Sequence, residues 1–191
     1  VADHQTMKAL VLAPFDPVVL SNLQKTLDIA YESWMDTKKL LSPQEFIDRI
    51  QGQGRDIVVV EADFLPREVF DKASNLRFLG VCRADVSHVD MSAATEHGVV
   101  VVNTPARNAI AVAELTLGLM LSLARHITAA HTMVQSGEWT DPTYAYFHLR
   151  GTELWGKTIG IIGFGAIGQQ VAKRLKAFDV SILVYDPYIG S

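Results

Sequence analysis

The chain has 191 residues, of which 49% are hydrophobic, and its formal net charge at pH 7 is −4. This composition supports a packed core and excludes a disordered chain, while the mixed-sign charge predicts no binding to nucleic acid or to an anionic membrane. The longest apolar runs, Val99–Val102 and Leu115–Leu123, are too short to span a bilayer. Cys82 is the single cysteine, and Val1–Thr6 lacks the pattern of a signal peptide. We expect a soluble, cytoplasmic α/β protein.

Short β-branched runs alternate with helical stretches up to residue 103, which is typical of parallel βαβ units. The strands are expected at residues 8–12, 29–34, 57–60, 77–81 and 99–102. A first helix is expected after Pro17, with a buried stripe of Val18, Leu20, Leu23 and Leu27. Ser42–Glu45 has the order of a helix cap, and Gly98 stands where a helix would end. The pattern predicts one doubly wound unit of five strands.

The character of the sequence changes after residue 103. From Asn108 to His126 a helical pattern runs for five turns and is apolar on nearly every face. Such a helix is expected to be buried, between domains or between subunits. The segment Gln135–Glu153 contains aromatic and turn-forming residues and is predicted to be an irregular connector. A second βαβ unit begins at Thr158.

The most informative chemistry lies in the glycine-rich turn after the predicted strand Thr158–Ile162. Gly163 permits a tight turn, Gly165 allows the backbone to approach a pyrophosphate, and Gly168 allows close packing of the helix on the strand. The free N–H groups at the helix start then face the phosphates. The expected dinucleotide-binding residues in this turn are Gly163, Phe164, Gly165, Ala166, Ile167 and Gly168. Ile167, Val171 and Leu175 are predicted to place the helix on the sheet.

An acidic residue completes this pattern, since Asp186 lies 18 residues after Gly168 at the end of the next strand. A carboxylate there accepts hydrogen bonds from the adenosine ribose and repels a 2′-phosphate. Pro187, which is also expected to bind the cofactor, and Tyr188 offer no cation for such a phosphate, so the predicted cofactor is NAD. The alternative is a glycine turn that only packs tightly, with Asp186 as a solvated strand end.

Two segments resemble the D-isomer-specific 2-hydroxyacid dehydrogenases, a family that includes phosphoglycerate, glycerate and formate dehydrogenases. The segments are Asn103–Thr116, with Leu121 and Arg125, and Glu153–Gly163, and the resemblance covers about the last two thirds of the chain. It implies a flavodoxin-like substrate domain over residues 1–103 and the first half of a Rossmann NAD-binding domain over residues 104–191. It also implies an NAD-dependent oxidoreductase that transfers hydride between nicotinamide and a 2-hydroxy or 2-oxo acid.

The resemblance implies that backbone N–H groups of the loop after the fourth strand bind the substrate carboxylate. The matching residues are Arg83, Ala84 and Asp85, although this loop is about two residues shorter than usual and Asp85 replaces a glycine. Asp85 would be costly beside a carboxylate unless it points away or pairs with Arg83. Asn108 is expected to cap the long helix and to reach the substrate, and Val112 matches a position near the nicotinamide.

The family's catalytic arginine, carboxylate and histidine occupy a later part of the nucleotide domain, and none of the six histidines here matches that motif. No catalytic residue is therefore expected within the segment, which by itself is expected to be inactive. The histidines show no metal-site spacing, and no metal is predicted. A non-catalytic, NAD-sensing scaffold related to corepressors is the alternative. The resemblance also implies a homodimer formed through the 108–126 helix, and leaves the particular 2-hydroxy acid open.

Overall fold

The computed structural model describes residues 6–190, so the prediction for the first five residues lies outside the described part of the chain. The chain divides into two compact units, residues 1–105 and residues 106–191. This division falls two residues after the predicted boundary at residue 103. The functions assigned to the two domains stay predictions.

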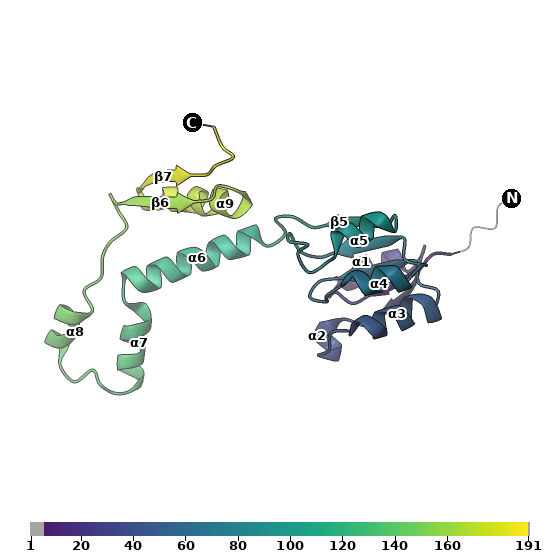
Figure 1. Ribbon diagram of the computed structural model, residues 1–191. Coiled ribbons are helices and arrows are strands. Elements are labelled where there is room, and N and C mark those ends of the chain that lie inside the picture. Colours follow the sequence, from purple (N-terminus) through teal and green to yellow (C-terminus); the bar gives the residue numbers. More distant parts are fainter. Residues whose placement is uncertain (1–5, 191) are drawn as a thin grey trace. The chain divides into compact units, whose positions relative to one another are not determined.

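The first unit contains a parallel sheet of five strands in the order β2-β1-β3-β4-β5. Its edge strand β5 is labelled in Figure 1. The strands are β1 (Lys8–Val11), β2 (Asp28–Tyr31), β3 (Ile57–Val60), β4 (Phe78–Val81) and β5 (Val100–Asn103). This is the flavodoxin-like order, in which the chain reverses direction across the sheet next to β1. The predicted α/β class and parallel sheet are confirmed.

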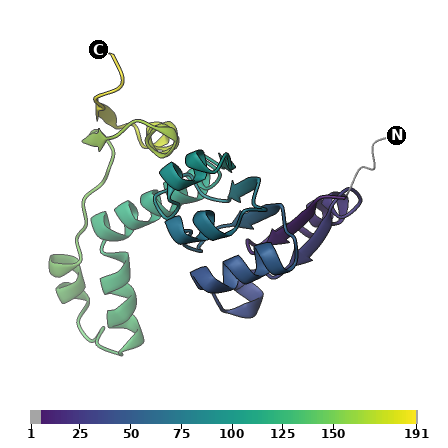
Figure 2. The same cartoon turned by 45° about the vertical axis from the view of Figure 1, so that its right-hand side comes forward.

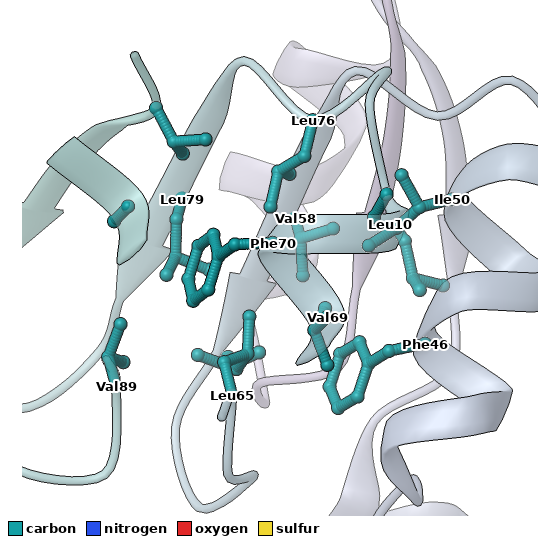
Figure 3. Close-up of a cluster of buried hydrophobic side chains, with 14 of the residues drawn as sticks. Leu10, Phe46, Ile50, Val58, Leu65, Val69, Phe70, Leu76, Leu79 and Val89 are labelled. Carbon is teal, nitrogen blue, oxygen red and sulfur yellow. The ribbon is translucent and has the colours of Figure 1, made fainter. Parts of the chain in front are cut away.

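Five helices connect these strands. They are α1 (Pro17–Leu23), α2 (Trp34–Thr37), α3 (Pro43–Gly52), α4 (Arg67–Lys72) and α5 (Met91–Glu96). Side chains from α3, α4 and α5 pack on one face of the sheet and form the main core, part of which Figure 3 shows. Phe46, Phe70, Leu10 and Leu79 are buried there almost completely. This core holds the carboxyl ends of β3 and β4, and therefore the loops that follow them, in place.

The predicted helix signals are confirmed in the first unit. The Ser42 hydroxyl accepts a hydrogen bond from the Glu45 N–H, and the Glu45 carboxylate accepts one from the Ser42 N–H, which completes a capping box at α3. Gly98 follows α5 with a φ of 68°, in the left-handed region that glycine adopts without a steric penalty.

The prediction of a buried stripe on α1 is wrong, because this helix has no buried residue and Val18 is 68% exposed. β2 and β3 lie on opposite sides of β1, so right-handed crossovers place α1 and α3 on opposite faces of the sheet. The face that α1 occupies is only partly covered, and Val100 and Val102 of β5 are exposed on it.

The second unit pairs two parallel strands with a long helix (Figure 2). Its elements are α6 (Ala109–Ala124), α7 (Ile127–Gln135), α8 (Pro142–His148), β6 (Thr158–Ile162), α9 (Ala166–Leu175), the 3-10 helix η1 (Lys176–Phe178) and β7 (Ser181–Tyr185). Ala113 of α6 packs with Val171 and Leu175 of α9 in a small core. Arg174 of α9 also donates a hydrogen bond to Glu114 of α6, at 3.1 Å.

Two expectations for the second unit are corrected. Ile167 is 42% exposed, so only Val171 and Leu175 of the predicted stripe bury α9 against the sheet. The predicted connector contains a short helix, α8, which Asp141 caps by accepting a hydrogen bond from the Thr143 N–H at 2.8 Å. The long apolar helix carries an exposed apolar face within residues 6–190, which agrees with burial between subunits, and its expected burial stays a prediction. The exposed members of this face are Leu115, Leu119 and Leu123.

Within residues 6–190, no single helix is long and apolar enough to cross a membrane. The pair α6 and α7 has the length and composition for one, but the two helices are bent by 66° at the break between them.

Candidate cofactor and substrate loops

The glycine turn of the second unit has the three local geometries that a dinucleotide requires. Gly163 has a φ of 88°, which an L side chain rarely adopts. A Cβ added at Gly168 would lie 2.3 Å from the Gly163 carbonyl oxygen, so the start of α9 lies tightly against the turn. A Cβ added at Gly165 would have no atom within 4 Å. The turn is therefore closed where the helix packs and open at the position where a pyrophosphate would approach.

The start of α9 offers free hydrogen-bond donors to that open side. Gly165 occupies the N-cap position, and no side chain caps the helix. The first N–H groups of a helix have no partner within it, and the helix dipole adds a positive partial charge at the same place. These groups suit an anion such as a diphosphate, and the donor set fits the predicted cofactor.

Asp186 is bound to the same turn from the end of β7. Its carboxylate accepts hydrogen bonds from the Phe164 N–H at 2.6 Å and from the Tyr188 N–H at 2.8 Å. These two donors, Phe164 first, lower the pKa of the Asp186 carboxyl below its ordinary value. A lowered pKa means that the ionised form stabilises the fold at neutral pH, and that this contribution is lost as the pH falls through the pKa of the folded state. Asp186 is therefore a fixed anion beside the turn.

The loop after β4 holds the predicted substrate residues in the first unit. Arg83, Ala84 and Asp85 are all exposed, and within residues 6–190 their backbone N–H groups have no hydrogen-bond acceptor. Asp85 does not require Arg83 as a partner, because its carboxylate accepts hydrogen bonds from the N–H and the hydroxyl of Ser87. These bonds lower the pKa of Asp85. The negative charge of Asp85 is therefore directed at Ser87 within the same loop.

Sequence reasoning missed the residue that anchors this loop. The Asn103 side chain donates a hydrogen bond from Nδ2 to the Ala84 carbonyl at 2.8 Å, and the Thr104 N–H donates one to the Arg83 carbonyl at 3.1 Å. Asn103 ends the run Val100–Asn103. An amide that directly follows a run of β-branched residues at a carboxyl edge was the available signal, because that edge is where parallel strands present polar groups.

Two residues that were predicted to bind ligands lie at the start of α6. Asn108 occupies the N-cap position, but its side chain accepts no capping hydrogen bond, so the capping prediction is wrong. Its φ of −108° and ψ of 7° are not the extended conformation that directs a cap side chain at the helix N–H groups. Val112 is half-buried in the first turn of α6, and Pro187 is exposed next to Asp186. The ligand roles of these three residues stay predictions.

The second unit also matches a known sequence family. Residues 117–191 match the family model of the D-isomer specific 2-hydroxyacid dehydrogenase, NAD binding domain. The chain is 40% identical over 186 residues to the 2-hydroxyacid dehydrogenase-like protein YoaD of Bacillus subtilis, covering 96% of this chain and 54% of that protein. It is 44% identical over 150 residues to a D-3-phosphoglycerate dehydrogenase of Methanocaldococcus jannaschii, covering 78% of this chain and 27% of that enzyme.

The chain belongs to the D-isomer-specific 2-hydroxyacid dehydrogenase family. It spans about half the length of the first of these relatives and about a quarter of the second. The family domain matched is an NAD-binding domain, which confirms the predicted cofactor.

Solved structures of this dehydrogenase family show the same architecture. A D-isomer-specific 2-hydroxyacid dehydrogenase-like protein from Polaromonas superposes with a TM-score of 0.81 at 28% identity, over 98% of this chain and 57% of that one. An NAD-dependent formate dehydrogenase from Staphylococcus aureus, solved in complex with NAD, superposes with a TM-score of 0.73 at 29% identity, over 95% of this chain and 57% of that one.

Proposed function

We propose that this chain is the substrate-binding domain and the first part of the cofactor domain of an NAD-dependent oxidoreductase. In the whole protein, hydride would pass between nicotinamide and the carbon that bears the hydroxyl of a small 2-hydroxy acid. The observation that carries the proposal is the glycine turn, closed at Gly168, open at Gly165 and joined to the Asp186 carboxylate. The named relatives, which are dehydrogenases, support it.

Each loop would have a separate task. The turn at Gly163–Gly168 and the first N–H groups of α9 would bind the diphosphate, and Asp186 would accept hydrogen bonds from the adenosine ribose. Its charge would disfavour a 2′-phosphate, which selects NAD over NADP. The free N–H groups of Arg83–Asp85 would bind the substrate carboxylate. A cytoplasmic location is part of the same proposal.

Gly165→Ala tests the cofactor site. We expect this variant to fold normally, because the added methyl meets no protein atom within 4 Å, and to bind NAD at least about tenfold more weakly because the methyl occupies the approach to the diphosphate. Isothermal titration of the 191-residue chain with NAD measures this. Gly160→Ala is the matched control, since its methyl also enters open space but lies in β6. Equal NAD affinity in the two variants would exclude the proposed site.

Residues 1–191 by themselves are expected to bind NAD without turnover, since none of their histidines matches the family's catalytic motif. NADH oxidation by the whole protein with small 2-oxo acids tests the reaction. If NAD is bound but no 2-oxo acid is reduced, the alternative of an NAD-sensing scaffold replaces the proposed enzyme. The choice among 2-hydroxy acids stays open.

We also propose that the chain forms a homodimer through the exposed apolar face of α6. Leu119→Asp, at a position 62% exposed on that face, is expected to raise the dimer dissociation constant by at least about a hundredfold, because a buried interface charge without a partner is strongly unfavourable. Sedimentation velocity measures the change. Val18→Asp on α1, which is also exposed, is the control and is expected to leave the dimer intact. A wild-type chain that stays monomeric at high concentration contradicts the proposal.

A further inference from the structure

Two ionisable side chains are buried in the first unit without complete hydrogen bonding. Asp63 is 1% exposed and His88 is 8% exposed. Within residues 6–190, Asp63 Oδ2 and both ring nitrogens of His88 have no hydrogen-bond partner. Burying such atoms unpaired is costly, so native structures seldom keep them without a function. The mechanism proposed above does not use either residue.

The two side chains belong to neighbouring loops that the backbone joins. Asp63 follows β3, and His88 follows β4. The Leu65 N–H donates a hydrogen bond to the His88 carbonyl at 3.0 Å, and the Asp90 N–H donates one to the Leu65 carbonyl at 2.9 Å. Leu65 and Val89, both labelled in Figure 3, form an isolated parallel bridge between the loops. A change in the charge of one side chain therefore acts on both loops.

Asp63 is held on its other side by the segment before α3, because its Oδ1 accepts a hydrogen bond from the Leu41 N–H at 3.0 Å. The His88 ring meets the edge of the Phe64 ring, with the ring centroids 6.4 Å apart. A cavity of about 390 Å³ adjoins His88 and is lined in part by Phe64, Ser87 and Asp90. Phe64 is 66% exposed, so this aromatic contact of His88 lies at the surface of the unit.

Burial and the attraction between Asp63 and His88 have opposite effects on the pKa of each side chain. Burial raises the pKa of Asp63 and lowers the pKa of His88, while the attraction between the two side chains acts against both changes. Arg83 further lowers the pKa of His88, and Asp85 raises it. Asp90, which lines the same cavity, caps α5 through the Ala93 N–H at 2.8 Å and lies 3.8 Å from Arg67.

We propose that Asp63 and His88 form an electrostatically coupled buried pair that links the loop after β3 to the loop after β4 and so positions the backbone N–H groups of Ala84 and Asp85. The pair carries a charge of −1 when the histidine is neutral and the carboxylate ionised. It becomes neutral when it takes one proton from solvent. Because the loop of residues 82–90 bears both His88 and the N–H groups, gaining or losing that proton changes the loop that would bind a substrate carboxylate.

NMR titration of the isotope-labelled 191-residue chain tests the pair without substrate. In Asp63→Asn, which removes the attracting charge, the midpoint of the His88 ring signals is expected to fall by at least about one pH unit, a tenfold loss of proton affinity. Asp85→Asn removes an exposed charge and is expected to cause a much smaller fall, because water screens that interaction. An unchanged His88 midpoint in Asp63→Asn overturns the proposal.

The same NMR spectra also report on the backbone of the loop of residues 82–90. The N–H signals of Ala84 and Asp85 are expected to shift at the His88 midpoint in the wild type and to follow the lowered midpoint in Asp63→Asn. A purely structural role would leave these signals without a step at that pH, and such a result also overturns the proposal. In His88→Asn the step is expected to disappear, and the Asp63→Asn result decides the question if His88→Asn does not fold.

The role given to Ala84 and Asp85 rests on the proposed function, and a separate probe distinguishes the two ideas. Glyoxylate added at constant pH is expected to shift the N–H signals of both residues. If glyoxylate has no effect while the Asp63 and His88 titrations are coupled as described, the proposed carboxylate site fails and the coupled pair stands.

Discussion

Gly168→Ala is expected to destabilise the second unit by about 3 kcal/mol and to abolish NAD binding at ordinary cofactor concentrations. The added Cβ would lie 2.3 Å from the Gly163 carbonyl oxygen and 3.2 Å from its carbon. Overpacking costs about 1–3 kcal/mol where neighbours adjust. Here the obstacle is the backbone of the turn itself, which cannot move aside without changing the cofactor loop, so the upper end of that range applies.

Hydrogen exchange measured by mass spectrometry locates this effect. Peptides from β6, α9 and β7 are expected to exchange faster in Gly168→Ala, whereas peptides from β1, β3 and β4 serve as the internal control and keep their wild-type rates. Gly165→Ala is the matched variant, because it places the same methyl in open space three residues earlier. Wild-type exchange throughout Gly168→Ala would show that the turn has more room than its geometry indicates.

Asp186→Asn is expected to weaken NAD binding roughly ten- to a hundredfold, which corresponds to the loss of hydrogen bonds to a charged acceptor. The asparagine nitrogen cannot accept the hydrogen bond that Phe164 N–H donates to Oδ2 in the wild type. The substitution also removes the charge that would repel a 2′-phosphate, so the preference for NAD over NADP is expected to narrow. Titration calorimetry with both cofactors measures these changes.

Asp179→Asn is the control for charge removal in the same unit. Asp179 is exposed before β7 and has a φ of 52°, a conformation that asparagine adopts readily. We expect its affinities for NAD and NADP to equal those of the wild type. A similar loss of NAD affinity in both variants would assign the effect to net charge and would contradict a direct role for Asp186.

The cofactor turn could be predicted from the sequence because each of its requirements is local. Gly163 and Gly168 are required by backbone conformation and by contacts within a few residues, and the strand and helix around them follow from hydrophobic periodicity. The capping box of α3 is local in the same sense. Such features depend on neighbours along the chain, and their spacing is visible without coordinates.

Other features depend on which segments meet in space. The helical stripe of α1 was apparent in the sequence, but its exposure follows from the sheet order, which leaves that helix on the partly covered face. Asn108 has the right residue type for a cap and the wrong backbone conformation. Residue type and spacing do not specify either condition.

The sequence by itself determined the α/β class, the glycine turn with its acidic partner, and the family. Only the tertiary structure decided that Asn103 anchors the loop of Ala84, 19 residues away, and that Asp63 and His88 are buried in adjoining loops. The reason is physical: a periodic pattern reports which face of one element is apolar, whereas burial and hydrogen bonding across loops arise only when the strands of a sheet bring distant segments together.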